Sequence, residues 1–355
     1  GTAGSVKAIE SQITNPFLLF YGDTMIDINL KALINYHNKK GGIATLVVHP
    51  NDHPHDSDLL DIDGHGQVTA FYCKPHGQDL YYRNLVNAAL YILTSEIFEY
   101  IEEDTFSDFG KDIFPKIVSM KKPLFAYNTS EYIKDIGTVE RLQEVEEDYL
   151  SGKIQRLNKL NMQKAIFVDR DGVINYEEEP LDASDKFRMF PGVKKALKIM
   201  NRSDYLAVVV TNQPLIAKGF ATEKQVDEIH NYMENILGEQ GAYVDRIYYC
   251  PHHPEKGHKG EKKDYKIVCE CRKPASGMIE KAVDDMNIDV TQSFIIGDRT
   301  VDIKTGINAG LNTILVKTGY AGKDGKYKCE PDYIFKDLNE AVNFLIIKYE
   351  PLFKK

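Results

Sequence analysis

The sequence lacks the features that mark membrane-spanning, secreted and nucleic-acid-binding proteins. None of its apolar runs approaches the roughly 20 residues that are needed to cross a bilayer. No signal-peptide pattern follows the first residue, although the chain opens on Gly1 rather than on Met, so this absence carries little weight. The formal net charge of −9 argues against the basic surface on which nucleic-acid binding depends. We therefore expect neither a membrane nor a nucleic-acid partner, and the sequence leaves the oligomeric state open.

Cysteine is also scarce, and its five occurrences are too unevenly spread for a disulfide framework. Three of them lie close together, at Cys250, Cys269 and Cys271, while Cys73 and Cys329 stand apart and are expected to be ordinary thiols. Such clustering indicates a bound metal in a reducing compartment, so we expect a cytoplasmic protein.

The clustered cysteines form two short pairs of possible metal ligands. Cys250-Pro251-His252 and Cys269-Glu270-Cys271 together supply four nitrogen and sulfur ligands, the number and kind that tetrahedral Zn²⁺ prefers. The alternative is a set of free thiols beside a surface histidine. His253 or His258 could replace His252, but the two-residue spacing favours His252. Because no water-polarising base adjoins the four residues, we expect a structural zinc ion.

Both halves of the chain alternate strand-like and helix-like segments, which predicts an α/β protein, and 355 residues suffice for two domains. The expected segments of the first half are strands at 17–21, 43–49, 67–73, 85–93 and 132–138, helices at 30–37, 105–120 and 139–149, and a polar loop at 51–63. Ser151–Met162 is polar and basic with few apolar anchors, which is typical of a linker. We expect domains over 1–150 and 164–355, joined by a linker over 151–163.

The stretch Ala165–Asp171 is the strongest functional signal of the second half. A short apolar run predicts a buried parallel strand, and it ends in Asp169, Asp171 and Gly172. In open α/β sheets, ligands bind beyond the carboxyl ends of the strands. Two carboxylates there can supply a nucleophile, a metal ligand and a proton-transfer group. Turn-capping aspartates are the alternative.

Three later segments repeat this placement of polar residues after an apolar strand. Thr211 and Asn212 end the predicted strand 205–210, where a hydroxyl and free amides suit a phosphate, unless Thr211 only closes the strand. Arg272 and Lys273 follow the last zinc ligand, so zinc would fix Lys273 against a phosphate; two solvated cations are the alternative. Asp298 and Asp302 follow strand 293–296 and can face one metal, or can cap a helix.

In this order the motifs resemble those of the haloacid-dehalogenase-like phosphatases, over nearly all of 164–347. The cluster C-x-H…C-x-C-R-K-P resembles the subgroup that contains heptose 1,7-bisphosphate and histidinol-phosphate phosphatases. The resemblance implies a Rossmann-type sheet in which Asp169 is the nucleophile and Asp171 the general acid and base. It also implies the following remaining roles: Mg²⁺ held by Asp169, Asp298 and the Asp171 carbonyl, Asp302 behind the metal, Thr211, Asn212 and Lys273 on the transferring phosphoryl group, and Arg272 on a second phosphate. Only one loop, one helix and one strand fit between Asp171 and Thr211, so we expect no large cap and an open site.

The first half resembles the later two-thirds of a sugar-1-phosphate nucleotidyltransferase, again a Rossmann-type domain. The segments that carry this resemblance are GTAG at 1–4, YGDT at 21–24, KP at 74–75, LVNAALYIL at 85–93 and DIGT at 135–138. It implies that Gly1–Gly4 lie near the base, Asn87 near the sugar, and Asp23 and Asp135 on a metal; from spacing alone, both acids also suit turns. The family's Gly-rich triphosphate loop would precede Gly1 and is absent from the sequence. We therefore expect no pyrophosphate release from GTP and a sugar 1-phosphate by this chain.

The two resemblances together select a substrate. The phosphatase motifs do not distinguish heptose bisphosphate from histidinol phosphate, but a nucleotidyltransferase consumes a sugar 1-phosphate. We expect removal of the 7-phosphate of D-glycero-D-manno-heptose 1,7-bisphosphate in heptose nucleotide-sugar synthesis, with histidinol-phosphate phosphatase as the alternative. A sugar-nucleotide transferase or binding protein with a degenerate phosphatase is a third hypothesis, and the intact acids and Lys273 argue against it.

Overall fold

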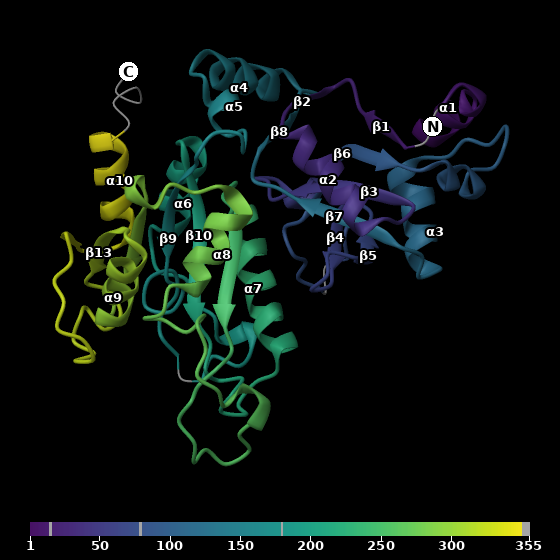
Figure 1. Ribbon diagram of the computed structural model, residues 1–355. Helices are drawn as coiled ribbons and strands as arrows, with labels where there is room; N and C mark the ends of the chain where they lie inside the picture. The colour runs from purple at the N-terminus through teal and green to yellow at the C-terminus, as the bar shows by residue number, and fades with distance from the viewer. Residues whose placement is uncertain (14–15, 78–79, 179, 350–355) are drawn as a thin grey trace. The chain divides into compact units, whose positions relative to one another are not determined.

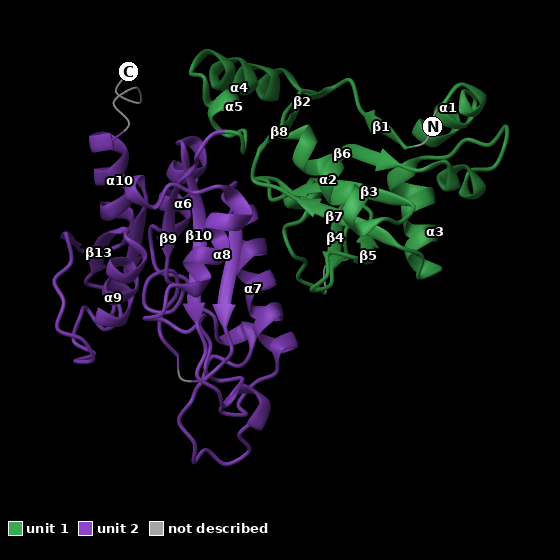
Figure 2. Cartoon of the chain, in the orientation of Figure 1, with its two compact units in different colours: residues 1–160 green, residues 161–355 purple. Residues whose placement is uncertain are grey.

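The chain folds into two compact units, residues 1–160 and 161–355 (Figures 1 and 2). The computed structural model describes residues 1–13, 16–77, 80–178 and 180–349. Within these ranges, no helix combines the length and the apolar character that a membrane span requires. Both units combine helices with sheets, so the predicted α/β class is confirmed.

Unit 1 is built on a mixed six-stranded sheet. Its strands run in the order β5-β4-β6-β3-β7, and β1 pairs with the end of β6; only β3 and β7 are parallel among the pairs in the described part of this sheet. Its elements are β1 (Phe17–Phe20), β3 (Ala44–His49), β4 (Leu59–Ile62), β5 (Val68–Tyr72), β6 (Val86–Leu93), β7 (Leu124–Asn128), and the helices α1 (Thr2–Lys7), α2 (Leu30–Lys40), α3 (Phe114–Ser119), α4 (Val139–Leu150) and α5 (Lys153–Arg156). A separate antiparallel ribbon pairs β2 (Thr24–Asp27) with β8 (Tyr132–Asp135).

Two expectations for unit 1 differ from the structure. The helix predicted over 105–120 begins only at Phe109, because the Asp108 carboxylate accepts hydrogen bonds from the amides of Gly110 and Lys111 and so starts the helical turn there. The loop predicted over 51–63 contains β4, whose Leu59 and Leu60 are buried. The His, Asp and Pro residues around this strand predict a loop, but the strand is stabilised by its antiparallel pairing with β5, which the local sequence does not indicate.

Unit 2 is a doubly wound, fully parallel sheet in the order β11-β10-β9-β12-β13-β14. Its strands are β9 (Lys164–Val168), β10 (Tyr205–Asn212), β11 (Arg246–Cys250), β12 (Phe294–Gly297), β13 (Asn312–Val316) and β14 (Tyr333–Phe335). Its helices are α6 (Val193–Arg202), α7 (Glu223–Gly238), α8 (Gly277–Met286), α9 (Thr300–Ala309) and α10 (Leu338–Tyr349). The residues of β9 and β10 are almost all buried, as expected for unbroken apolar runs covered on both faces.

The order of the strands decides where the site forms. The first strand of unit 2, β9, lies in the middle of the sheet. The next two strands, β10 and β11, are added on one side of it, and β12, β13 and β14 follow on the other side. The reversal between β9 and β12 opens a crevice beyond their carboxyl ends, the usual place for a ligand in such sheets. Among the described residues, neither the segment between β9 and α6 nor the one between β11 and α8 forms a separate cap domain.

Candidate active site and metal centres

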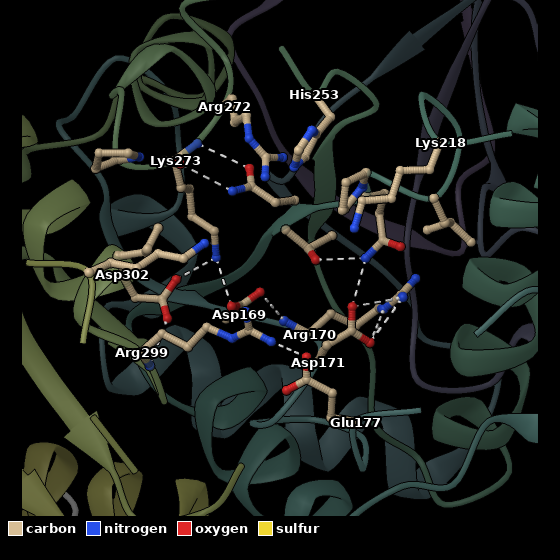
Figure 3. A pocket seen from close by; sticks show the side chains of 18 of the residues that line it. Asp169, Arg170, Asp171, Glu177, Lys218, His253, Arg272, Lys273, Arg299 and Asp302 are labelled. Atoms are coloured by element: carbon tan, nitrogen blue, oxygen red, sulfur yellow. Dashed lines mark hydrogen bonds and ion pairs between the residues drawn. The ribbon is translucent and has the colours of Figure 1, made fainter. Parts of the chain in front are cut away.

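The side chains predicted for phosphate chemistry come from the ends of three neighbouring strands of unit 2. Asp169 follows β9, Thr211 lies at the end of β10, and Asp298 follows β12, so all three reach the same edge of the sheet. Lys273 joins them from the segment before α8. A cavity of about 800 Å³ opens at this edge, and Asp169, Thr211 and Lys273 line it (Figure 3).

Lys273 forms ion pairs with two carboxylates in the wall of this cavity. Its Nζ lies 2.8 Å from Asp169 Oδ2 and 2.5 Å from Asp302 Oδ1, and all three side chains are buried (Figure 3). Burial alone would lower the pKa of Lys273, but the two carboxylates outweigh it and raise that pKa above its ordinary value. The ammonium group is therefore a fixed positive charge beside Asp169, which excludes the alternative of a solvated lysine.

Asp169, Asp298 and Asp302 form a buried cluster that fits a divalent cation. Their nearest carboxylate oxygens lie within 4.8 Å of one another, and Lys273 contacts two of the three acids, Asp169 and Asp302. Asp298 Oδ2 accepts the amide of Tyr320 at 2.7 Å, whereas the buried Asp298 Oδ1 has no hydrogen-bond partner in the described part of the chain. Burial, and then the charge of Asp302, raises the pKa of Asp298 to about 7. Uncompensated carboxylate oxygens of this kind suit Mg²⁺.

Close packing around Asp298 explains one glycine of the first motif. Gly172 has φ +84°, and a Cβ atom there would lie 2.4 Å from Asp298 Oδ2. Any side chain at this position would displace the acid. Capping of α9 by Asp298 is wrong, because the residue before the helix is Arg299, whose amide donates to Asp302 Oδ2.

Asp171 lies beside the cluster in a different environment. Its carboxylate accepts hydrogen bonds from Arg170 (Figure 3). It also accepts them from Asn175 Nδ2 at 2.9 Å and from Gln213 Nε2 at 2.8 Å. Burial works to raise its pKa, but Arg170, Asn175 and Gln213 together hold that pKa below its usual value. Asp169 and Asp171 are thus chemically distinct although they are two residues apart. None of these three donors was predicted from the sequence, in which the only signal is the arginine between the two acids.

Thr211, Asn212 and Arg272, for which the sequence predicts contacts with phosphate, line the same cavity. The Thr211 hydroxyl accepts Gln213 Nε2 at 2.9 Å. The side chain of Asn212 forms two hydrogen bonds with the backbone of Lys273. Its Oδ1 accepts a hydrogen bond from the Lys273 amide at 3.0 Å, and its Nδ2 donates one to the Lys273 carbonyl at 3.2 Å. Asn212 therefore positions Lys273, a contact that the sequence did not suggest.

The cavity is also lined by charged side chains that the sequence did not indicate as site residues. They include Glu177, Lys218 and Arg299 (Figure 3). Arg299 pairs with Glu177 and stacks on Tyr320, with its guanidinium 3.9 Å from the ring centroid. The arginine thereby ties together three loops around the acid cluster.

Cys250, His252, Cys269 and Cys271 come together at the base of the loop that follows β11. Their ligand atoms lie within 4.8 Å of one another. The sulfurs of Cys271 and Cys250 are 3.1 Å apart, and Cys250 Sγ lies 3.7 Å from His252 Nδ1. A tetrahedral site with Zn–S bonds of about 2.3 Å has edges of roughly 3.8 Å. All three cysteines are free thiols, so the four ligand atoms fit a zinc ion. Arg272 Nη1 donates to the carbonyl of His252 at 3.0 Å, which links the cavity to this group.

The sites predicted in unit 1 are brought together only in part. Asp23 directly precedes β2 and Asp135 is the last residue of β8, and the amide of Ile136 donates a hydrogen bond to the carbonyl of Asp23. Arg141 Nη1 binds both oxygens of the Asp135 carboxylate, at 2.6 and 2.8 Å, and Asp23 is exposed. A common metal site for the two acids stays a prediction.

The predicted base and sugar contacts of unit 1 lie on other elements. Asn87, on β6, donates to the Tyr91 hydroxyl at 3.0 Å, and its buried Oδ1 has no partner among the described residues. Gly1–Gly4 lie at the start of α1, where the amide of Ala3 donates to the carbonyl of Ser107.

The sheet of unit 2 and the four motifs at its edge define a haloacid-dehalogenase-like phosphatase. Comparison with family models agrees, since residues 270–341 match the HAD-hydrolase-like model and residues 1–152 match the nucleotidyl transferase model. The chain therefore joins a nucleotidyltransferase-like segment to a phosphatase.

Curated relatives narrow the class. A 185-residue stretch, 51% of this chain, is 43% identical to a D-glycero-beta-D-manno-heptose-1,7-bisphosphate 7-phosphatase of Haemophilus ducreyi and covers 98% of it. A protein of the same name from Haemophilus influenzae is 44% identical over 159 residues, which is 44% of this chain and 84% of the relative. The chain belongs to this family of phosphatases.

Among solved structures, a D,D-heptose 1,7-bisphosphate phosphatase from B. bronchiseptica, complexed with magnesium and phosphate, is 28% identical with a TM-score of 0.47. The match covers 52% of this chain and 99% of that one. HddC from Yersinia pseudotuberculosis is 27% identical with a TM-score of 0.36, covering 42% of this chain and 62% of that chain.

Proposed function

We propose that this chain is a Mg²⁺-dependent phosphatase that removes the 7-phosphate of D-glycero-D-manno-heptose 1,7-bisphosphate. The observation that carries the proposal is the buried arrangement of Asp169, Lys273, Asp298 and Asp302 beside Asp171, at the carboxyl edge of the sheet. Membership in the family named above supports the substrate.

Two carboxylates divide the chemistry. An Asp169 oxygen attacks phosphorus, the bond from phosphorus to the sugar oxygen breaks, and an aspartyl-phosphate forms. Asp171 gives the departing sugar oxygen a proton and then takes one from the water that hydrolyses the aspartyl-phosphate. Before substrate binds, Asp171 is an anion held by Arg170; a phosphate dianion placed beside it favours uptake of the proton that the first step needs.

The remaining groups position charge. Lys273 contacts Asp169 and meets the phosphoryl oxygens, and the Thr211 hydroxyl and the Asn212 side chain lie on the same wall of the cavity. Arg272 lines the cavity on the side of the zinc-type cluster, where it suits the second phosphate of a bisphosphate.

Two metals fit the residues present. Asp169, Asp298 and the carbonyl of Asp171 would hold Mg²⁺, which would offset the charge between a carboxylate and a phosphate, with Asp302 orienting Lys273 behind them. Cys250, His252, Cys269 and Cys271 would hold a structural Zn²⁺ that fixes the adjoining Arg272 and Lys273.

The substrate choice rests also on the first half of the chain. We propose a nucleotidyltransferase-like domain over 1–150, a linker over 151–163 and the phosphatase domain over 164–355. The phosphatase would leave a sugar 1-phosphate, which is the class of molecule that a nucleotidyltransferase consumes. This supports a place in heptose nucleotide-sugar synthesis and argues against histidinol phosphate.

The test is phosphate release from the α- and β-anomers of the heptose bisphosphate and from histidinol phosphate, side by side with Mg²⁺. We expect kcat/KM for one heptose anomer to exceed that for histidinol phosphate by about 100-fold or more, because a second phosphate adds charge-assisted hydrogen bonds. A preference for histidinol phosphate would sink the proposal.

A further inference from the structure

Arg170, between the two catalytic acids, is fully buried and turns back onto its own neighbour. Its Nη2 donates to both oxygens of Asp171 at 3.0 Å, and its Nε lies 3.2 Å from Asp171 Oδ1 (Figure 3). A planar guanidinium that binds both oxygens of a carboxylate fixes the orientation of that carboxylate as well as its distance.

The other side of the same guanidinium meets a buried histidine from a different element. Arg170 Nη1 lies 3.0 Å from Nε2 of His230, which belongs to α7. Arginine has only donors, so Nε2 must accept and His230 must carry its proton on Nδ1. The ring of His230 also lies beside Tyr249 of β11, with the centroids 5.4 Å apart, so packing limits its motion.

We propose that Arg170 and His230 are positioning residues for proton transfer by Asp171, an inference that rests on the acid and base role given to Asp171 above. His230 fixes one nitrogen of the guanidinium and leaves the Nε and Nη2 edge facing the carboxylate. Asn175 and Gln213 hold the same carboxylate from two other directions. Without His230, the guanidinium of Arg170 keeps its charge but loses the hydrogen bond that fixes the orientation of its plane.

A purely structural role for the pair predicts a different outcome. If Arg170 and His230 only stabilise the fold, their loss lowers the amount of folded enzyme and affects every substrate equally. If they position a proton donor and acceptor, the loss depends on whether the step needs a proton. An alkoxide leaving group needs one, whereas p-nitrophenolate departs without one. Hydrolysis of the aspartyl-phosphate needs a base with either substrate.

The experiment compares wild type with His230→Phe, which removes the acceptor, and His230→Gln, whose side-chain oxygen can restore it. With p-nitrophenyl phosphate we expect a burst on rapid mixing, because hydrolysis of the aspartyl-phosphate needs a base whereas its formation from this substrate needs no proton. The burst amplitude counts active sites, and the burst rate reports the attack by Asp169. For His230→Phe we expect the burst rate within about threefold of wild type, but kcat per active site on the heptose bisphosphate about 10- to 100-fold lower with little change in KM. His230→Gln should recover most of this loss. Equal losses in burst rate and kcat, or an unchanged kcat, would overturn the proposal.

Two controls keep the result decisive. Counting sites by the burst amplitude corrects for any unfolded His230→Phe protein, and Arg170→Lys provides a second variant that keeps the charge and loses the fork; it should show the same selective loss. His37→Phe removes a buried histidine from α2 of unit 1 and should leave both rates unchanged. If wild type cleaves p-nitrophenyl phosphate and glycerol 3-phosphate but not the heptose bisphosphate, the proposed substrate is rejected, and glycerol 3-phosphate replaces it in the same comparison.

Discussion

In the active site of unit 2, oppositely charged side chains hold one another in position. Three buried acids face one lysine, and the lysine contacts two of them. Such a group is costly to bury unless each charge has a partner. The excess negative charge of the three acids destabilises the fold when the site is empty. The same excess charge allows the site to bind a cation together with a phosphate.

The nucleophile is the first residue to test. Asp169→Asn keeps the shape of the side chain but removes the anion that attacks phosphorus. We expect phosphate release to fall by at least about 1,000-fold. Asp185→Asn, at an exposed position of the same unit, is the matched control and should keep wild-type activity. Retained activity in Asp169→Asn would reject Asp169 as the nucleophile.

Lys273 should matter for both stability and catalysis. Lys273→Met leaves Asp169 and Asp302 without their shared cation, so we expect the free energy of unfolding to fall by about 3–5 kcal/mol in magnesium-free buffer. We also expect kcat/KM to fall by about 100-fold or more. Urea denaturation and steady-state kinetics measure the two effects. An unfolding free energy equal to that of wild type would show that the ion pairs contribute nothing.

At the scale of elements, strand ends and one loop bring the site together. Asp169 directly follows β9, Thr211 and Asn212 end β10, and Asp298 directly follows β12, so all of them lie at the same edge of the sheet. The loop after β11 has little apolar content of its own, and its ends meet at the cluster of three cysteines and one histidine. Lys273 follows this cluster by two residues, so the position of the lysine depends on how the loop is closed.

Loss of the cluster of three cysteines and one histidine should therefore displace Lys273 and lower the phosphatase activity. In Cys271→Ser we expect metal analysis to show zinc falling from about one ion per chain to near zero, and phosphatase activity to fall by about tenfold or more. Cys329→Ser changes a thiol of the same unit outside the cluster and should keep both zinc and activity. Zinc-free wild-type protein with full activity would contradict the link between the loop and Lys273.

The end of β3 in unit 1 predicts a dependence of stability on pH. Burial, and then the charge of His53, lowers the pKa of His49 to about 4, well below its ordinary value of 6.5; Asp52 and Lys134 also face it. A histidine that resists protonation when folded contributes stability above pH 6.5, and this contribution is lost as the pH falls from 6.5 towards 4. We expect His49→Gln to remove on the order of 2 kcal/mol of this dependence.

Urea denaturation of wild type and His49→Gln at several pH values across this window measures that difference. His65→Gln, an exposed histidine of the same unit, is the control and should follow wild type. Parallel curves for wild type and His49→Gln would contradict the prediction.

At the scale of the whole molecule, the phosphatase site belongs to one unit. Every residue that lines the cavity, and every member of both metal clusters, lies within 161–355. Unit 2 also has its own large apolar core around β9 and β10. A chain of residues 161–355 should therefore fold alone and retain kcat within about twofold of the full chain. Circular dichroism and phosphate release test this, and an inactive but folded unit 2 would show that unit 1 contributes to the reaction.

The α/β class and the phosphatase class of the second half could be predicted from the sequence alone. Apolar runs that end in DRDG, TNQ and GDRTVD predict strands, and the order of strand-end residues predicts a phosphatase site, because a parallel sheet brings strand ends to one edge. The cysteine and histidine spacing predicted a four-ligand cluster, and the loop after β11 brings its two pairs of ligands together.

Only the tertiary structure decided which partners each acid has. Gln213 lies 42 residues from Asp171, His230 lies 60 residues from Arg170, and Asp302 lies 29 residues from Lys273, and no local pattern encodes these contacts. β4 was hidden for the same reason, since pairing across the sheet outweighs a polar local sequence. Residue types fix what a side chain can do, but burial and neighbours fix its charge and orientation. For that reason the fold, and not the motif, separates Asp169 beside Lys273 from Asp171 beside Arg170.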